Sequence, residues 1–240
     1  MTMAEALRAL ASEQDCYLCG ATASQPVCAD CVAALPRLPA GICPCCALPS
    51  GTGSTCGRCI ASLPHYDATV AARAYGDPLD HALQAFKYRH ALGLTRFLAS
   101  LLDAAIDSAG STSSTGSTPG VDLVVPMPLA RARLAERGFN QALELARPIA
   151  ARRRIRLDPL AVRRTRDAPP QAGLPWKERA RNIKGAFACD AALGGLRVAV
   201  VDDVMTTGAT LDELARVLKQ AGAAHVTNWV VARTLPHAPV

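Results

Sequence analysis

Cysteine spacing constrains the first quarter of this chain more than any other feature of the sequence. Nine of the ten cysteines lie between residues 16 and 59. Eight of them form four Cys-x-x-Cys pairs, which are Cys16 and Cys19, Cys28 and Cys31, Cys43 and Cys46, and Cys56 and Cys59. Zinc binds four thiolates in a tetrahedron, and each pair offers two sulfurs to one side of a metal. The spacing therefore predicts two structural Zn2+ sites with four cysteines each.

The spacing does not decide which pairs share a metal ion. Sequential pairing would form two small ribbons in tandem, and an interleaved arrangement is also compatible with the sequence. A disulfide framework is the alternative to metal, but it is typical of secreted chains. The first ten residues have neither the charged start nor the apolar run of a signal peptide, and no stretch approaches the ~20 apolar residues of a membrane span. We therefore expect a cytoplasmic protein with reduced thiols.

Length and composition predict two parts of unequal size. The chain has 240 residues, and half of them are hydrophobic, which is ample for one sizeable domain. The cysteine-rich segment has too few large apolar residues for a core of its own, so bound metal would supply its folding free energy. We expect a small zinc-ribbon domain over residues 1–62 and a larger domain over residues 63–240.

The larger part alternates between apolar runs and amphipathic stretches. Strands are predicted within residues 61–76, at the sheet edge, and at 121–125, 197–201 and 225–232. Helical stripes of apolar residues fall within 79–86, 94–105, 142–149 and 211–218. Strands that alternate with helices predict an α/β fold with a mainly parallel sheet. Ligands of such sheets bind outside the carboxyl ends of the strands, which here means after the second and third predicted strands.

The end of the third predicted strand carries an unusual set of polar residues, in the sequence VAVVDDVMTTGATLDELARVL at 198–218. Its two carboxylates, Asp202 and Asp203, suit the vicinal hydroxyls of a sugar because carboxylates accept hydrogen bonds. The loop that follows holds three threonines and Gly208 and leads into a helix N-terminus, which can bind phosphate without a cation. The corner therefore predicts a site for a ribose 5-phosphate. The alternative interpretation is an ordinary strand-to-helix turn with capping residues.

The sequence VVDDVMTTGAT resembles the phosphoribosyl-pyrophosphate (PRPP) signature of type I phosphoribosyltransferases. From about Cys16 to Thr234 the chain is similar to the ComF family (competence protein F), which joins an N-terminal zinc segment to such a domain. The similarity includes FKY at 86–88, VVPMPL at 124–129, ERGFNQA at 136–142 and PPQAGLPWKERARNIKGAF at 169–187. It implies the type I phosphoribosyltransferase fold for the larger domain.

The resemblance also implies roles for individual residues. Asp202 and Asp203 would bind the ribose hydroxyls, and one of them would assist charge at the reacting carbon. The 5-phosphate would lie against Thr206, Thr207, Gly208, Ala209 and Thr210. Pyrophosphate would face the backbone N–H groups of Met127 and Leu129, together with Lys87, Arg131, Arg133 and Arg137. A lid over residues 163–187 would contain Gln171, Arg179 and Asn182.

If the chain is an enzyme, the resemblance implies displacement of pyrophosphate at the anomeric carbon of PRPP, with Mg2+ neutralising the leaving group. The acceptor would be a nitrogenous base, which nothing in the sequence identifies. Two departures from the family pattern bear on turnover. Ala168 stands where a threonine is expected, and residues 130–138 lack the usual histidine and proline.

A second hypothesis, which the resemblance also implies, is a non-catalytic module that binds single-stranded DNA or a helicase partner during DNA uptake. The net charge is +6, and basic runs occur at 152–156, 163–166 and 177–184. Lysine and arginine neutralise nucleic-acid phosphates without reading sequence. Aromatic residues, on which bases stack, make up only 4% of the chain, so such binding would depend on charge. Solvated helix faces are the alternative interpretation of these runs.

Overall fold

The computed structural model describes residues 14–111, 120–165 and 183–236. Its centre is a five-stranded sheet in the order β3-β9-β8-β4-β5, and every neighbouring pair in it is parallel. The strands are β3 (Ala68–Ala74), β4 (Leu123–Pro126), β5 (Arg156–Leu157), β8 (Arg197–Met205) and β9 (His225–Arg233). The sheet confirms the predicted α/β class, and β3 is the edge strand expected within residues 61–76.

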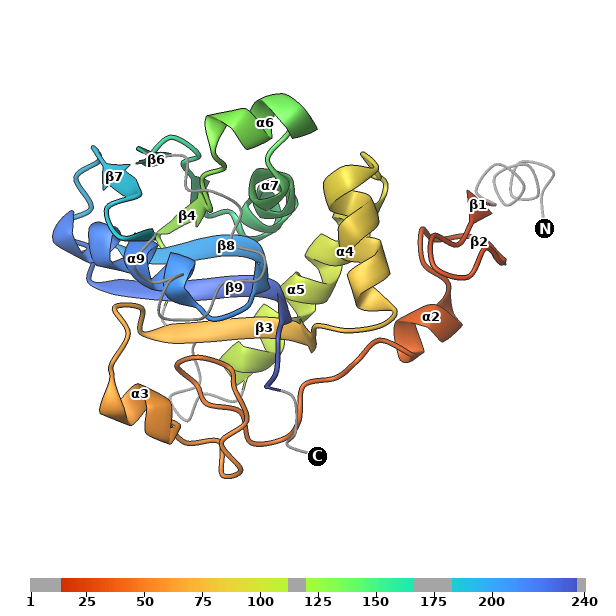
Figure 1. The fold of residues 1–240 in the computed structure, drawn as a ribbon, viewed down its shortest axis with the longest axis horizontal. Coiled ribbons are helices and arrows are strands. Elements are labelled where there is room, and N and C mark those ends of the chain that lie inside the picture. The colour runs from red at the N-terminus through yellow and green to blue at the C-terminus, as the bar shows by residue number, and fades with distance from the viewer. Residues whose placement is uncertain (1–13, 112–119, 166–182, 237–240) are drawn as a thin grey trace.

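Helices cover both faces of this sheet (Figure 1). One face packs against α4 (Leu79–Tyr88), α5 (Leu94–Ser111) and α7 (Gln141–Arg153), and the other packs against α9 (Ala209–Gln220). Ala199 and Val201 of β8 join the core under α5 and α7, whereas Val198 and Val200 join the core under α9. Because side chains alternate along a strand, a sheet covered on both faces needs an unbroken apolar run. The run at 198–201 meets that need.

Strand β8 ends at Met205 rather than at the predicted residue 201. Val204 and Met205 pair with Ala232 and Arg233 of β9, so both aspartates lie in the strand and not in the loop after it. The apolar run stops at Val201, and sequence periodicity carries no sign that β9 continues alongside. Main-chain hydrogen bonding to β9 therefore extends the strand through its polar residues.

Several short elements had no periodic signal in the sequence. Helix α6 (Arg131–Arg137) follows β4, and β6 (Val162–Arg164) pairs antiparallel with β7 (Phe187–Cys189). This hairpin holds the two ends of the expected lid. The lid residues Gln171, Arg179 and Asn182 lie outside the described residues, so their role stays a prediction.

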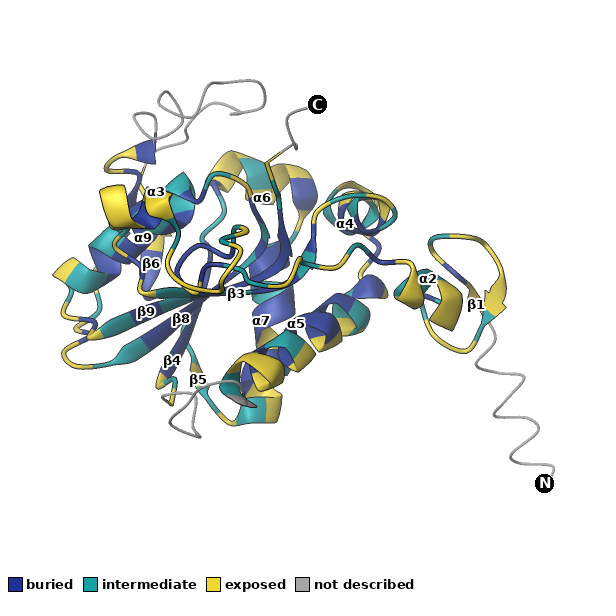
Figure 2. Ribbon diagram, turned by 90° about the horizontal axis from the view of Figure 1, so that it is seen from below, coloured by how far each residue is buried: buried dark blue, intermediate teal, exposed yellow. Residues whose placement is uncertain are grey.

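The cysteine-rich segment occupies two separate places. The elements of its first half are β1 (Gln14–Asp15), β2 (Thr22–Ala23) and α2 (Ala29–Ala33), and those of its second half are limited to α3 (Gly57–Ala61). Figures 1 and 2 place α2 beyond α4, and α3 on the side of the molecule where α9 lies. Cys16 accordingly packs into the core shared with α4 and α5, while Cys43 and Cys46 pack into the core shared with α9.

The central strands β4, β8 and β9, which have helices on both faces of the sheet, are buried along most of their length (Figure 2). None of the helices in the described ranges is both long and apolar enough to cross a lipid bilayer.

Candidate ligand site and metal centres

The eight paired cysteines form two clusters of four, and the pairing is sequential. Cys16, Cys19, Cys28 and Cys31 form the first cluster, and Cys43, Cys46, Cys56 and Cys59 form the second. Within each cluster all four sulfurs lie within 4.8 Å of one another. Zinc–sulfur bonds of ~2.3 Å in a tetrahedron place sulfurs about 3.8 Å apart. The closest recorded sulfur pairs are Cys19 with Cys28 at 3.7 Å and Cys46 with Cys56 at 3.6 Å, so both clusters fit a zinc ion.

The two clusters repeat the same local geometry. The Cys28 N–H donates to Cys16 Sγ at 3.3 Å, and the Cys56 N–H donates to Cys43 Sγ at 3.3 Å. Burial alone would raise the pKa of these two thiols, but the backbone N–H donors outweigh it and lower the pKa to about 6 at Cys16 and about 7 at Cys43. The thiolate is the form that binds metal. The remaining cysteine of the segment, Cys45, belongs to neither cluster, and burial raises the pKa of its thiol to about 11.

The corner after β8 has a backbone that only glycine suits. Gly208 has a φ of +84°, and a Cβ there would lie 2.7 Å from Met205 Cε and 3.1 Å from the Tyr66 hydroxyl. The chain therefore turns tightly from the strand into α9 against two buried side chains. Thr207 Oγ1 accepts the Ala209 N–H at 3.3 Å. The Asp212 N–H makes the first bond of the helix, to the Gly208 carbonyl, and the N–H groups before it belong to a helix end where the dipole favours an anion.

The two aspartates at the end of β8 differ in environment. Asp203 is buried, and its Oδ2 lies 2.8 Å from the Nζ of Lys87 on α4, while its Oδ1 accepts the Val204 N–H. Asp202 is partly exposed, and its Oδ1 accepts the Asp203 N–H. Although part of the residue reaches solvent, loss of hydration at the carboxyl group, followed by the charge of Asp203, raises the pKa of Asp202. Burial would lower the pKa of Lys87, but the two aspartates outweigh it and raise that pKa.

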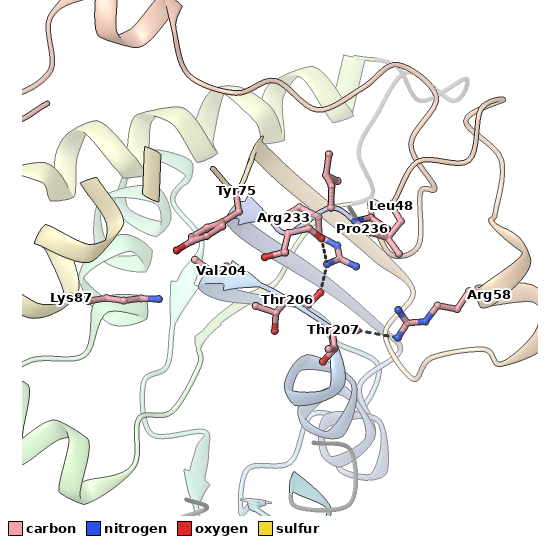
Figure 3. A pocket seen from close by; sticks show the side chains of 11 residues that line it. Leu48, Arg58, Tyr75, Lys87, Val204, Thr206, Thr207, Arg233 and Pro236 are labelled. Carbon is pink, nitrogen blue, oxygen red and sulfur yellow. Dashed lines mark hydrogen bonds between the residues drawn. The ribbon is translucent and has the colours of Figure 1, made fainter. Parts of the chain in front are cut away.

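An open cleft of about 710 Å³ lies beside this corner (Figure 3). Of the expected ligand-binding residues, Lys87, Thr206 and Thr207 line it. Its other lining residues are Leu48, Arg58, Tyr75, Val204, Arg233, Thr234, Leu235 and Pro236. Figure 3 shows the side chains of Lys87 and Arg58 reaching toward the loop from opposite sides. Neither aspartate is among the residues that line the cleft, and the Asp203 carboxylate lies against Lys87, which does line it.

Arg233, at the end of β9, is hydrogen-bonded to the start of the loop that joins β8 to α9. Its side chain is buried, and its Nη1 donates to the carbonyls of Met205, Thr206 and Thr234. Its Nε donates to the Cys46 carbonyl at 2.8 Å. Burial lowers the pKa of this guanidinium. One side chain thus connects the corner at residues 205–208, called the ligand corner below for the ligand proposed there, to the second cysteine cluster.

The structure does not bring the expected pyrophosphate ligands from the β4 turn to this cleft. The Met127 N–H donates to the Val201 carbonyl at 2.9 Å, so the backbone donor expected there extends the sheet instead. Arg137 is buried and lies over the Tyr88 ring, with its Cζ 4.8 Å from the ring centroid. Arg131 and Leu129 border a different groove, which is described below.

Sequence reasoning missed Tyr75, Arg233 and Arg58. Tyr75 and Arg233 lie at the carboxyl ends of β3 and β9, which is where ligands of parallel sheets bind. Applying that rule to every strand, and not only to β4 and β8, would have found both. Arg58 lies between Cys56 and Cys59 of the second cluster, and nothing in the sequence signals its proximity to residue 207.

A second groove, of about 860 Å³, runs between the β4 turn, α7 and β6. Four arginines line it, namely Arg131, Arg147, Arg163 and Arg164. Some of their charge is compensated, because Arg147 pairs with Glu144 and Arg163 pairs with Asp190. The basic run at 152–156 is more fully engaged within the protein, since Arg152 and Arg153 both pair with buried Asp103 on α5.

The chain is similar to proteins named for competence and DNA utilization. DNA utilization protein YhgH of Salmonella typhi is 35% identical, over 92% of this chain and 97% of its own length. Competence protein F of Haemophilus influenzae is 34% identical, over 74% of this chain and 78% of its own length. A purine phosphoribosyltransferase from Pyrococcus horikoshii aligns over 61% of this chain and 91% of that chain, at 16% identity and with a TM-score of 0.31. No protein-family model matches the chain.

Proposed function

Because the chain belongs to the ComF family of competence proteins, we propose that it binds a phosphoribosyl ligand, such as PRPP with Mg2+, at the carboxyl end of β8. The proposal rests on the corner at Gly208. There a glycine with positive φ turns the chain from β8 into α9, beside a cleft that Lys87 lines. The names of the relatives support a role in DNA uptake. Transfer of the phosphoribosyl group to an acceptor is the further step that this site would permit.

Each part of such a ligand has a chemical counterpart at the corner. The 5-phosphate would bind the N–H groups at the start of α9 and the hydroxyls of Thr206 and Thr207. Pyrophosphate would bind Lys87, with Mg2+ compensating the remaining charge. In the structure Lys87 neutralises Asp203. A pyrophosphate that attracted Lys87 would release the Asp203 carboxylate to accept a ribose hydroxyl, so the ion pair is the element that ligand binding would rearrange.

Calorimetry with Mg-PRPP tests this proposal. The native chain should give saturable heat, and Asp203→Asn should weaken binding at least about tenfold because the amide removes the carboxylate acceptor. Asp107→Asn is the matched control, since that exposed aspartate lies on α5 away from the cleft. Absence of heat with the native chain, or equal affinity for both variants, would contradict the proposal.

Catalysis has its own test. The chain would be incubated with Mg-PRPP and a panel of nitrogenous bases, and released pyrophosphate would be measured. Displacement forms a bond between the base nitrogen and the anomeric carbon, and breaks the bond from that carbon to the pyrophosphate oxygen. Release that depends on one base would identify the acceptor. Binding without release for any base would favour a module that keeps the ligand site without turnover.

Single-stranded DNA binding is the second candidate, and the groove with four arginines favours it. Affinity for a short oligonucleotide should fall with salt, because displaced counterions drive such binding. Arg131→Ala and Arg164→Ala should each reduce the salt slope by about one charge. Arg96→Ala on α5, outside the groove, serves as the control. A salt slope that none of these substitutions changes would rule out this groove as the DNA site.

A further inference from the structure

The second cysteine cluster reaches the ligand corner through Arg58. This arginine lies between Cys56 and Cys59 on α3, and its Nη2 donates to the Thr207 carbonyl at 3.1 Å. It lines the cleft together with Thr206 and Thr207, as Figure 3 shows. Helix α3 has five residues and no side-chain cap, and a helix this short is not stable by itself. The position of Arg58 therefore depends on what holds the cysteines on either side of it.

Arg233 provides a second connection between the same two places. It donates to the Cys46 carbonyl and also to the carbonyls of Met205 and Thr206 at the start of the loop. The acceptors recorded for it in the described ranges are main-chain carbonyls, and none is a carboxylate. A buried cation needs a compensating charge. Four thiolates around one zinc ion carry net negative charge, and this cluster is adjacent to the guanidinium.

Packing joins the cluster to the loop as well. Cys43, Cys46 and Cys59 belong to the same buried core as Tyr66 and Met205. Those last two side chains are the ones that a Cβ on Gly208 would meet. The metal cluster, the floor of the corner and the left-handed turn are thus in continuous contact.

Within the described residues the first cluster donates no hydrogen bond to this loop, and it approaches the cleft only by packing against α4, the helix that carries Lys87. Cys16 packs in the core of the α4 and α5 face, and the Tyr17 ring lies where a Cβ on Gly93, just before α5, would meet it. Among the described residues, nothing from the first cluster or from α2 lines the cleft. Two clusters with the same local geometry therefore stand in different relations to the ligand corner, which provides an internal control.

We infer that the second cysteine cluster is part of the ligand site, whereas the first is not. Metal bound there holds the loop at 206–208 in its binding conformation through Arg233, and presents Arg58 to the phosphate of the ligand. The identity of the ligand rests on the proposed function. The connection from cluster to loop does not rest on it.

Hydrogen exchange measured by mass spectrometry tests the connection without any ligand. Cys59→Ser and Cys31→Ser remove the corresponding fourth cysteine of the second and first clusters, and metal analysis should find one zinc lost in each. Exchange in a peptide covering 202–212 should become faster in Cys59→Ser and stay at the native rate in Cys31→Ser. Native-rate exchange in a Cys59→Ser protein that has lost its zinc, or equal acceleration in both variants, would overturn the inference.

Substitutions that keep all eight cysteines cover the case in which Cys59→Ser does not fold. Arg58→Ala should retain both zinc ions, speed exchange of the same peptide and weaken binding of ribose 5-phosphate about fivefold, with partial recovery in Arg58→Lys. Arg96→Ala should change neither quantity. Native exchange and native affinity in Arg58→Ala would overturn the inference. If the native chain binds neither ribose 5-phosphate nor Mg-PRPP, the proposed function fails, and the exchange measurements still decide the inference.

Discussion

At the scale of single residues, the identity of Gly208 is explained by two independent constraints. Its φ is positive, and its missing Cβ leaves room for Met205 and Tyr66. Gly195 has a similar φ of +75°, but a Cβ there would meet nothing within 4 Å. The two glycines therefore separate the cost of backbone strain from the cost of crowding.

We expect Gly195→Ala to lower the free energy of unfolding by about 1 kcal/mol, from strain alone. Gly208→Ala should cost up to about 1 kcal/mol more, because the terminal methyl of Met205 and the Tyr66 hydroxyl must both shift within a packed core. Urea unfolding of both variants and the native chain measures the difference. Equal losses in the two variants would show that the corner relaxes around the methyl group.

The raised pKa of Asp202 makes a prediction about pH. A carboxyl whose pKa is higher in the folded chain than in the unfolded chain stabilises the fold at low pH, and this contribution is lost as pH rises through the raised pKa. Asp202→Asn should therefore gain stability relative to the native chain between about pH 4 and pH 8, by about 1 kcal/mol or more. Urea unfolding of both proteins across this range tests it. The cysteines are unchanged, so metal-linked terms cancel, and a difference independent of pH would contradict the assignment.

At the scale of elements, the contact between α5 and α7 depends on a buried charge. Asp103 of α5 is 3% exposed and pairs with Arg152 and Arg153 of α7. Asp107 lies one turn further along α5 and pairs with the same two arginines, but its side chain is 55% exposed. This arrangement explains why part of a basic run that suggested DNA binding in the sequence has a structural role.

Asp103→Ala should lower the free energy of unfolding by about 2 to 3 kcal/mol, because it leaves the side chain of Arg153 without its buried partner. Asp107→Ala should cost less than about 1 kcal/mol, because solvent screens an exposed pair. Thermal or urea unfolding of the two variants distinguishes the sites. Similar losses at both positions would mean that burial does not set the strength of this network.

At the scale of the whole molecule, the two cysteine clusters pack into the two cores that lie on opposite faces of one sheet. The first packs beside α4 and α5, and the second packs on the side of α9. The domain boundary expected at residue 62 stays a prediction, although each cluster shares a buried core with the larger part of the chain.

Metal analysis of the purified native chain should find two zinc ions per chain. Chelation should then expose apolar side chains that both clusters now cover, because neither segment has a core of its own. Binding of a dye that reports exposed apolar surface, followed during chelation, measures this change. One zinc per chain would mean that only one of the two cysteine clusters is a metal site.

The elements of this fold could be predicted because their signals are local. Cysteine pairs with two residues between them, apolar runs and helical stripes are patterns within short stretches of sequence. They indicated the two cysteine clusters, four of the five strands of the parallel sheet and its covering helices. The end of β8 was missed because pairing with β9, and not the composition of β8, extends that strand.

By itself the sequence determined the longer helices and strands and the four cysteine pairs, together with the loop chemistry at residues 206–210. Only the tertiary structure decided which charges meet. It places Arg58 against a carbonyl 149 residues away, directs the Met127 N–H into the sheet and stacks Arg137 on Tyr88. The physical reason is that a donor or a cation takes the acceptor that packing brings closest. That proximity is set by the layering of helices and clusters on the sheet, and no short stretch of sequence contains it.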